Sequence, residues 1–272
     1  MSDTAIDASG PKFWRDKALP YIEARSVGDA RTVSYGKHWH EAFSVGLISR
    51  GRCKYFNRGT TTDAGVGTVV FMNPGDVHAC NPLRGEPWSY KMVYIDVPWL
   101  CETQDAAGIA PIAAISSTRP ELYAGLNRIF DTLIDRDAGL LEKQTASIGL
   151  VELLQRCLGP DRPTQRARVP RLTRAAEFIR ENCARSLNLE EICREVSLSG
   201  SYFIRAFRQA YGLTPHAYQL NCRIEFCRSQ LRGGRSLADV AHEAGFSDQA
   251  HFQRTFKRFV AATPGDYQNR CF

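Results

Sequence analysis

Three histidines in the first third of the chain have the types and spacing of metal ligands or of polar groups in a ligand pocket. His38 and His40 stand two residues apart in the segment GKHWHE, and His78 follows in GTVVFMNPGDVHACN. Alternation along an extended strand puts His38 and His40 on the same face, whereas Glu41 alternates to the opposite face. Three imidazoles can bind a metal and leave one position open. Because no carboxylate joins them, we expect no metal and interpret them as groups that line a pocket or cap turns.

Aromatic side chains follow on a later predicted strand. Trp88, Tyr90, Met92 and Tyr94 alternate along one face of that strand. They would fill a core or line a pocket with polar tips. We assign Trp88, Tyr90 and Tyr94 to the same ligand pocket as the three histidines, and core filling remains the alternative for at least two of the four.

Between residues 187 and 268, one predicted helical segment occurs twice in similar sequence. Ile192 corresponds to Val240, 48 residues later, and Phe203 corresponds to Phe252, 49 residues later. Each copy predicts a short helix, a tight turn and a second helix with two phenylalanines four residues apart on one face. Basic side chains occupy the opposite face of each second helix: Arg205, Arg208, Arg254 and Lys257. This is the helix-turn-helix arrangement, whose second helix enters the major groove of DNA.

Capping residues support these helices. Asn188 and Ser236 precede the two first helices, and we expect Ser199 and Ser247 to cap the two second helices. A helix of about 19 residues, Thr214 to Arg232, connects the copies and spans about 28 Å at 1.5 Å per residue. That length would hold two recognition helices roughly one DNA turn apart, close to the 34 Å between successive major grooves on one side of the duplex.

Residues 171 to 270 resemble the DNA-binding domain of the AraC family of bacterial transcription regulators. The resemblance is carried by ICREV, which begins at Ile192, and above all by DVAHEAGFSDQAHFQRTFK, which begins at Asp239. It implies that the early positions of each recognition helix face the bases. These positions are Ser201, Ile204 and Arg205 in the first copy, and Gln249, Ala250, His251 and Arg254 in the second.

The N-terminal part resembles another known fold. Between Arg31 and Asp96, β-branched and aromatic residues alternate with turn signals, which predicts short antiparallel strands in a barrel. The two histidine-bearing segments resemble the two motifs of the cupin barrel, which AraC-family regulators often carry as an effector-binding domain. Cupin enzymes add a glutamate to three histidines, and here Ser44 and Val45 occupy the expected glutamate region.

Two further helical stripes follow the predicted barrel. Leu122, Leu126, Ile129 and Leu133 make the first stripe, and Ile148, Val151, Leu154 and Leu158 make the second. One stripe should cover the barrel, and the other would seal a homodimer or pack against the same barrel. The polar, proline-bearing segment 159–170 is interpreted as a linker.

Charge and composition agree with this division. Of 272 residues, those from Arg168 onward hold 16 Lys and Arg against 10 Asp and Glu, so the formal charge of +6 lies entirely in that part. No apolar run is long enough for a membrane span and the N-terminus has no signal pattern, so we expect a cytoplasmic protein. Nine scattered cysteines without a CxxC pair are expected to be free.

The sequence therefore predicts an α+β protein of two domains. Residues 1–158 form a cupin-like effector-binding and dimerisation domain, and residues 171–272 form an all-helical DNA-binding domain with helix-turn-helix motifs at 189–211 and 236–260. The expected function is that of a sequence-specific regulator, an activator by resemblance, that binds operator DNA, a small effector of unknown identity and RNA polymerase, without cofactor or catalysis. A cupin-type metalloenzyme fused to a basic helical domain is the main alternative, and an architectural DNA binder without effector is the second.

Overall fold

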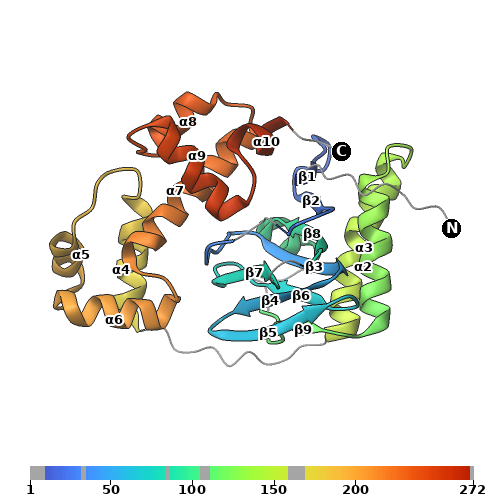
Figure 1. Cartoon of the computed structure of the whole chain (residues 1–272), viewed down its shortest axis with the longest axis horizontal. Coiled ribbons are helices and arrows are strands. Elements are labelled where there is room, and N and C mark those ends of the chain that lie inside the picture. Colours follow the sequence, from blue (N-terminus) through green and yellow to red (C-terminus); the bar gives the residue numbers. More distant parts are fainter. Residues whose placement is uncertain (1–9, 32–34, 84–85, 105–110, 159–168, 270–272) are drawn as a thin grey trace.

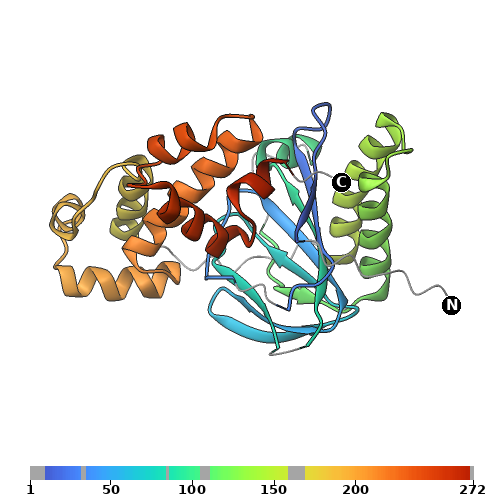
Figure 2. The ribbon, with the colours of Figure 1, turned by 45° about the horizontal axis from the view of Figure 1, so that its top comes forward.

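The computed structural model of the chain describes residues 10–31, 35–83, 86–104, 111–158 and 169–269. Strands and three helices make up the part up to Leu158, and helices follow from Pro170. In Figure 1 a pair of helices covers the outer side of the strands, and the C-terminal helices lie on the opposite side. Figure 2 shows the same arrangement after rotation.

The strands form two antiparallel sheets, as the expected barrel requires. The larger sheet has the order β1-β2-β8-β3-β6-β9 and the smaller has the order β5-β4-β7. The strands are β1 (Lys12–Trp14), β2 (Ile22–Val27), β3 (Phe43–Arg50), β4 (Arg52–Asn57), β5 (Thr60–Gly65), β6 (Val69–Met72), β7 (His78–Pro82), β8 (Ser89–Ile95) and β9 (Ser116–Ser117).

A single glycine carries the chain from the larger sheet to the smaller. Gly51 joins β3 to β4 with φ of 69°. A Cβ atom at this position would lie 1.9 Å from the carbonyl oxygen of Pro87. Only glycine satisfies both the backbone conformation and the close approach.

Two hydrophobic cores stabilise this part of the molecule. One lies between the sheets and includes Tyr55, Met72 and Trp88. The other lies between the larger sheet and the helices α1 (Val97–Thr103), α2 (Pro120–Ile134) and α3 (Leu140–Leu158). The first predicted stripe packs there, as do Val151, Leu154 and Leu158 of the second, whereas Ile148 is exposed. The proposal that the second stripe seals a dimer is therefore wrong for Val151 and Leu154, whose side chains are buried in the chain's own core.

The C-terminal helices form two similar modules joined by one long helix. The first contains α4 (Pro170–Glu181), α5 (Leu189–Val196) and α6 (Gly200–Tyr211), and the second contains α8 (Leu237–Glu243), α9 (Gln249–Val260) and α10 (Pro264–Asn269). The connector is α7 (Pro215–Arg232), which runs between the modules in Figure 1. The repeated phenylalanines Phe203, Phe207, Phe252 and Phe256 are fully buried, which confirms that they form the module cores.

Two of the four predicted caps on these helices make the expected side-chain hydrogen bond. The side chains of Asn188 and Ser236 accept hydrogen bonds from backbone N–H groups in their first turns, as expected. Ser199 occupies the cap position of α6 without a side-chain bond. The prediction that Ser247 caps α9 is wrong, because the carboxylate of Asp248, one residue later, accepts that bond instead. A carboxylate at this position also interacts favourably with the helix dipole.

The element bounds match the predicted helix-turn-helix motifs. The segments α5–α6 and α8–α9 cover residues 189–211 and 237–260. Most of the predicted linker, residues 159–168, lies outside the described residues, and α4 begins at Pro170, inside the segment interpreted as linker. Among the helices that the structure describes, none is both long and apolar enough to cross a bilayer.

Phe207→Ala should lower the free energy of unfolding of the helical domain by about 3 to 5 kcal/mol, because it removes a fully buried ring and leaves a cavity. Denaturant unfolding measures this change. Tyr202→Ala, on the solvent side of the same helix, is the matched control and should cost less than about 0.5 kcal/mol. Equal losses in the two variants would mean that the buried and exposed faces of α6 are reversed.

Candidate nucleic-acid interface and ligand cavity

The predicted DNA-reading residues lie on the outer faces of α6 and α9. The exposed residues of this set are Ser201, Ile204, Arg205, Arg208, Gln249, Ala250, Arg254 and Lys257, and His251 is half-buried. His251 packs its ring edge against Phe246, with the ring centroids 5.4 Å apart. The nine residues therefore form two solvent-facing surfaces, one on each module.

The arginines on these faces differ from Arg174 and Arg185 of the same domain. Arg174 and Arg185 form ion pairs with glutamates of α5. In the described part of the chain, no carboxylate forms a salt bridge with Arg205, Arg208 or Arg254. Their charges are available to an external polyanion, which is the electrostatic feature of a DNA-binding surface.

Sequence reasoning missed one exposed side chain on the first module. Tyr202 lies between Ser201 and the buried Phe203, with 52% of its surface exposed. A large aromatic group so exposed in the first turn of a recognition helix is suited to contact bases or sugars. Its position next to a core phenylalanine was the signal that would have identified it.

A cavity of about 50 Å³ lies between the two sheets. The predicted pocket residues His38, His78, Trp88, Tyr90 and Tyr94 line it. His40 does not line this cavity. It lines a second, smaller cavity of about 10 Å³ that lies between the sheets and helices α7 and α9.

The three histidines meet although the segment 36–42 is not a regular strand. His38 forms an isolated β-bridge with His78. The ring centroid of His78 lies 4.4 Å from that of His38 and 4.7 Å from that of His40. The predicted cluster is therefore present, but a bridge to β7 positions it instead of the expected strand.

Hydrogen bonds define the tautomer of each histidine. Every Nδ1 lies 2.8 to 2.9 Å from a backbone carbonyl oxygen, at Gly36 for His38, Ala42 for His40 and Asp76 for His78. A carbonyl only accepts, so each Nδ1 carries the proton and each Nε2 presents a lone pair.

Electrostatics keep these imidazoles neutral. Burial lowers the pKa of His38 and His40 well below the ordinary value, and His78 beside them lowers it further. Burial lowers the pKa of His78 to about 4, and the Arg228 guanidinium contributes in the same direction. Ser44, in the region where cupin enzymes carry glutamate, has its Oγ 3.1 Å from Nε2 of His40. A cationic neighbour and a hydroxyl in place of a carboxylate do not favour a divalent metal, and the described residues form no metal-binding group.

Arg25 is a cavity residue that sequence reasoning missed. It lies in the middle of β2, opposite Met92 of β8, and only 3% of its surface is exposed. Its Nη2 donates to the hydroxyl of Tyr35 at 2.5 Å, and its Nε has no partner. Arg25 shares one face of the strand IEARSV with Glu23, and this pair of opposite charges was the available signal.

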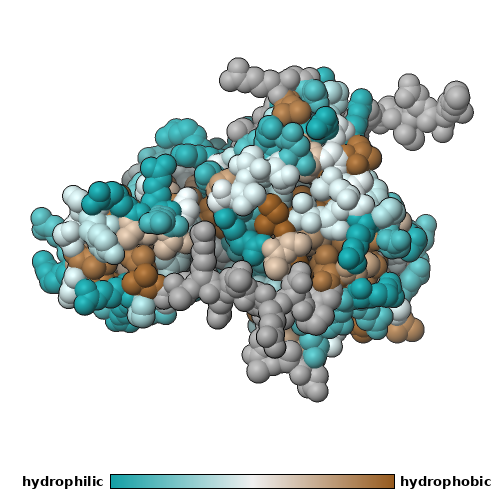
Figure 3. Space-filling model, turned by 90° about the horizontal axis from the view of Figure 1, so that it is seen from below, coloured by the Kyte–Doolittle hydropathy of each residue, from teal (hydrophilic) through white to brown (hydrophobic). Residues whose placement is uncertain are grey.

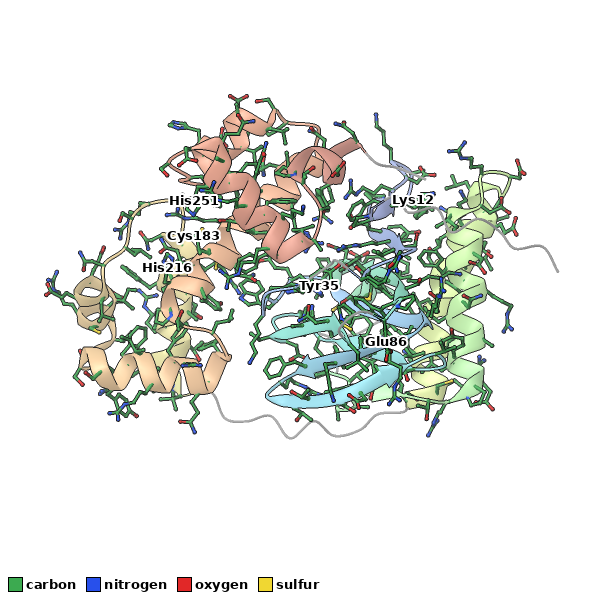
Figure 4. The ribbon with its side chains drawn as sticks, viewed as in Figure 1. Lys12, Tyr35, Glu86, Cys183, His216 and His251 are labelled. Atoms are coloured by element: carbon green, nitrogen blue, oxygen red, sulfur yellow. The ribbon has the colours of Figure 1, made fainter. Side chains whose placement is uncertain are left out.

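The histidine segment is also held by the helical domain. The backbone N–H of Trp39 donates to Oδ1 of Asn221 at 3.0 Å, and Nδ2 of Asn221 donates to the carbonyl of Trp39 at 2.8 Å. The Trp39 ring packs against Tyr218, with centroids 5.3 Å apart. Nearby, the Gly36 N–H donates to the carbonyl of Arg258 in α9. In Figure 4, Tyr35 lies at this boundary between strands and helices.

A buried carboxylate makes a second contact between the domains. Glu23 of β2 is paired with Arg15 at 2.7 Å, and the Arg232 guanidinium of α7 lies 4.0 Å away. Burial raises the pKa of Glu23, but Arg15, Arg232 and Arg228 outweigh this effect and the net pKa is lowered. The charged form therefore persists at neutral pH and holds α7 against the strands.

Comparisons with known proteins agree with this geometry. Residues 20–156 match the model of an AraC-like ligand binding domain, and residues 192–270 match that of a helix-turn-helix domain. The virulence regulon transcriptional activator VirF of Yersinia enterocolitica serotype O:8 is 32% identical over 83% of this chain and 88% of its own. The chain belongs to the AraC family of transcription regulators.

Two further similar proteins share less sequence identity with this AraC-family regulator. The arabinose operon regulatory protein of Escherichia coli is 24% identical over 85% of this chain and 82% of its own. The apo form of a ToxT protein from Vibrio cholerae has the same fold, with a TM-score of 0.58 at 12% identity over 97% of both chains. The matches to an AraC-like ligand binding domain and a helix-turn-helix domain make the chain a ligand-binding, DNA-binding transcription regulator of this family.

The neutral histidines predict a pH-dependent stability. Because the folded protein favours neutral imidazoles, the unfolded chain binds more protons below its ordinary histidine pKa of about 6.5. The contribution is complete above that value, and it is lost as the pH falls from there to about 4 for His78. The free energy of unfolding should fall by up to about 1.4 kcal/mol per pH unit for each histidine.

Chemical denaturation between pH 6.5 and 5 measures this slope. His78→Gln removes one titrating group and should reduce the slope by about 0.7 kcal/mol per pH unit at pH 6.5, rising toward about 1.4 kcal/mol per pH unit near pH 5. His242→Gln, on the exposed side of α8, should keep the wild-type slope. A slope unchanged by His78→Gln would contradict the buried neutral cluster.

Proposed function

We propose that this regulator binds two successive major grooves of DNA with α6 and α9. We further propose that a small effector bound between its two sheets changes its affinity for DNA. One observation carries the proposal: Arg25, His38 and Tyr94 line both the cavity between the sheets and the cavity at the domain boundary. A molecule that moves these side chains changes the surface on which the helical domain rests.

The DNA-reading part of the proposal rests on the two exposed faces. The connector α7 has 18 residues, which span about 27 Å and suit modules one DNA turn apart. Arg205 and Arg254 are suited to guanine edges. Ile204 and Ala250 offer apolar contact only, which suits thymine methyl groups. We assign residues 171–272 to DNA binding, residues 1–158 to effector binding and residues 159–170 to the linker.

The regulatory part of the proposal follows from linkage. An effector shifts a conformational equilibrium only by its difference in affinity for the two states. The two proposed states differ in the position of the helical domain relative to the strand-rich domain, which the contacts of Trp39 and Glu23 determine. Because α7 and α9 both touch the strand-rich domain, a change in this position alters how the two recognition helices meet successive grooves. The same coupling makes DNA change the affinity for effector.

We further propose a homodimer that activates transcription through RNA polymerase in the cytoplasm, without catalytic activity. VirF of Yersinia enterocolitica carries the name of an activator. Leu140, Leu141 and Ile148 are exposed on α3 and suit a subunit contact. The face seen in Figure 3 carries only small separate hydrophobic patches on a largely hydrophilic surface. A metalloenzyme is not favoured, because no carboxylate completes the three histidines.

Arg205→Ala and Arg254→Ala should each weaken binding to a selected operator by about 1 to 3 kcal/mol while leaving thermal unfolding unchanged. Fluorescence anisotropy with duplexes recovered from a random pool measures the affinity. Arg174→Ala removes the same charge from an arginine already paired with Glu195 and serves as control. If all three variants lose affinity equally at every sequence, the arginines contact only phosphates and the assigned base-reading face is wrong.

Asn221→Ala should change operator affinity by about fivefold or more, although Asn221 is buried away from the DNA-reading faces. The reason is that the variant leaves the N–H and carbonyl of Trp39 without their partner. Asn127→Ala, on α2 far from the domain boundary, should leave the affinity unchanged. Unaltered affinity in Asn221→Ala, with intact cooperative unfolding, would argue against coupling through this contact.

A further inference from the structure

The cavity between the sheets contains a buried positive charge without a carboxylate partner. Among the described residues, no Asp or Glu forms a salt bridge with Arg25, and its Nε has no hydrogen-bond acceptor. A buried charge that lacks a counter-ion is costly unless something pairs it. The guanidinium presents a planar set of donors that matches a carboxylate.

The neighbouring guanidinium differs in this respect. Arg228 of α7 lines the smaller cavity together with Arg25. It is already paired with Glu225 at 2.9 Å, and the buried Glu23 is close enough to stabilise its charge. The charge left to be balanced is therefore that of Arg25, and a single negative charge balances it.

Tyrosine hydroxyls surround Arg25 but do not neutralise it. The guanidinium carbon lies 5.6 Å from the ring centre of Tyr35 and 5.8 Å from that of Tyr90. Burial raises the pKa of Tyr35 to about 12 and that of Tyr90 well above its ordinary value, so both stay protonated. Their hydroxyls are hydrogen-bonded to each other, which uses one of the two protons. The remaining proton can be donated to a ligand, and a donor next to a cation suits an anionic oxygen.

The histidines that line the same cavity are suited to a hydrogen-bond donor, in contrast to Arg25, which is suited to an anionic acceptor. In His38 and His78 the protonated Nδ1 is used by a backbone carbonyl. Neither Nε2 has a partner among the described residues, whereas Nε2 of His40 meets Ser44. Each free Nε2 is an acceptor that a hydroxyl group can satisfy.

We propose that the cavity binds a compact hydroxycarboxylate, whose carboxylate pairs with Arg25 and whose hydroxyl donates to His38 or His78. The inference rests on the proposed function only in treating this ligand as the effector. The cavity of about 50 Å³ is much smaller than the 150 Å³ cavity that holds benzene in another protein. The ligand therefore has few non-hydrogen atoms. The apolar part of the lining offers no partner for a second charged group.

Calorimetric titration of the full chain at constant ionic strength tests the proposal with three probes of similar size. Acetate should bind, and acetamide, its neutral analogue, should not. Glycolate, which adds one hydroxyl, should bind about 3- to 10-fold more tightly than acetate, the gain of one hydrogen bond. Equal heats for acetate and acetamide would overturn the assignment of an anion site, and equal affinities for acetate and glycolate would overturn the assignment of the hydroxyl.

Variants locate the site. Arg25→Met should abolish binding of acetate and glycolate, whereas Arg52→Met, on an exposed arginine of β4, should leave both unchanged. Either His38→Leu or His78→Leu should remove the preference for glycolate and keep acetate binding. If Arg25→Met does not fold, the wild-type comparison of acetate with acetamide still decides. Retained binding in a folded Arg25→Met variant would contradict the proposal.

Operator binding separates this inference from the proposed function. If glycolate binds and operator affinity does not change, the anion site stands and the proposed coupling fails. If no probe distinguishes charge while Asn221→Ala still alters operator affinity, the coupling stands and the hydroxycarboxylate site is wrong.

Discussion

The buried backbone of Trp39 is the constraint on which the arrangement of the two domains depends. Its N–H and carbonyl face a helix instead of a neighbouring strand, and an unpaired buried peptide group is costly. One side-chain amide, that of Asn221, satisfies both groups. Trp39 separates His38, which lines both cavities, from His40, which lines only the smaller one. The segment docked by Asn221 is therefore the same segment to which we assign effector binding.

The helical domain connects that segment to the two recognition helices. Both modules depend on the strand-rich domain, since Trp39 and Val77 belong to the core of the first module and Phe13 belongs to the core of the second. Two recognition helices joined by one long helix meet successive grooves only in a limited range of relative orientations. In the proposed mechanism, a small shift at the boundary favours or disfavours that range, because packed interfaces switch between discrete arrangements.

Local features were predictable from the sequence, and long-range ones were not. The buried phenylalanine pairs, the two stripes of α2 and α3 and the caps Asn188 and Ser236 follow from helical periodicity and capping chemistry. The histidine cluster was predicted by strand alternation, although a bridge to β7 forms it. Asn221 and Trp39 are 182 residues apart, and no local pattern links them. Arg25 was missed because it alternates with apolar residues together with Glu23, a pattern typical of the solvent side of a strand. Asp248 was missed because the serine before it is an equally good cap in sequence.

Hydrogen exchange at the Trp39 amide tests the coupling between docking and DNA binding most directly. This N–H is buried and donates to Asn221 in the free protein, so it should exchange slowly. The account predicts that its exchange rate changes when a saturating selected operator is added, while a reference amide in the core between the sheets, such as that of Met72, keeps its rate. An identical rate at Trp39 with and without operator would contradict the account, because the docking contact would then be independent of DNA.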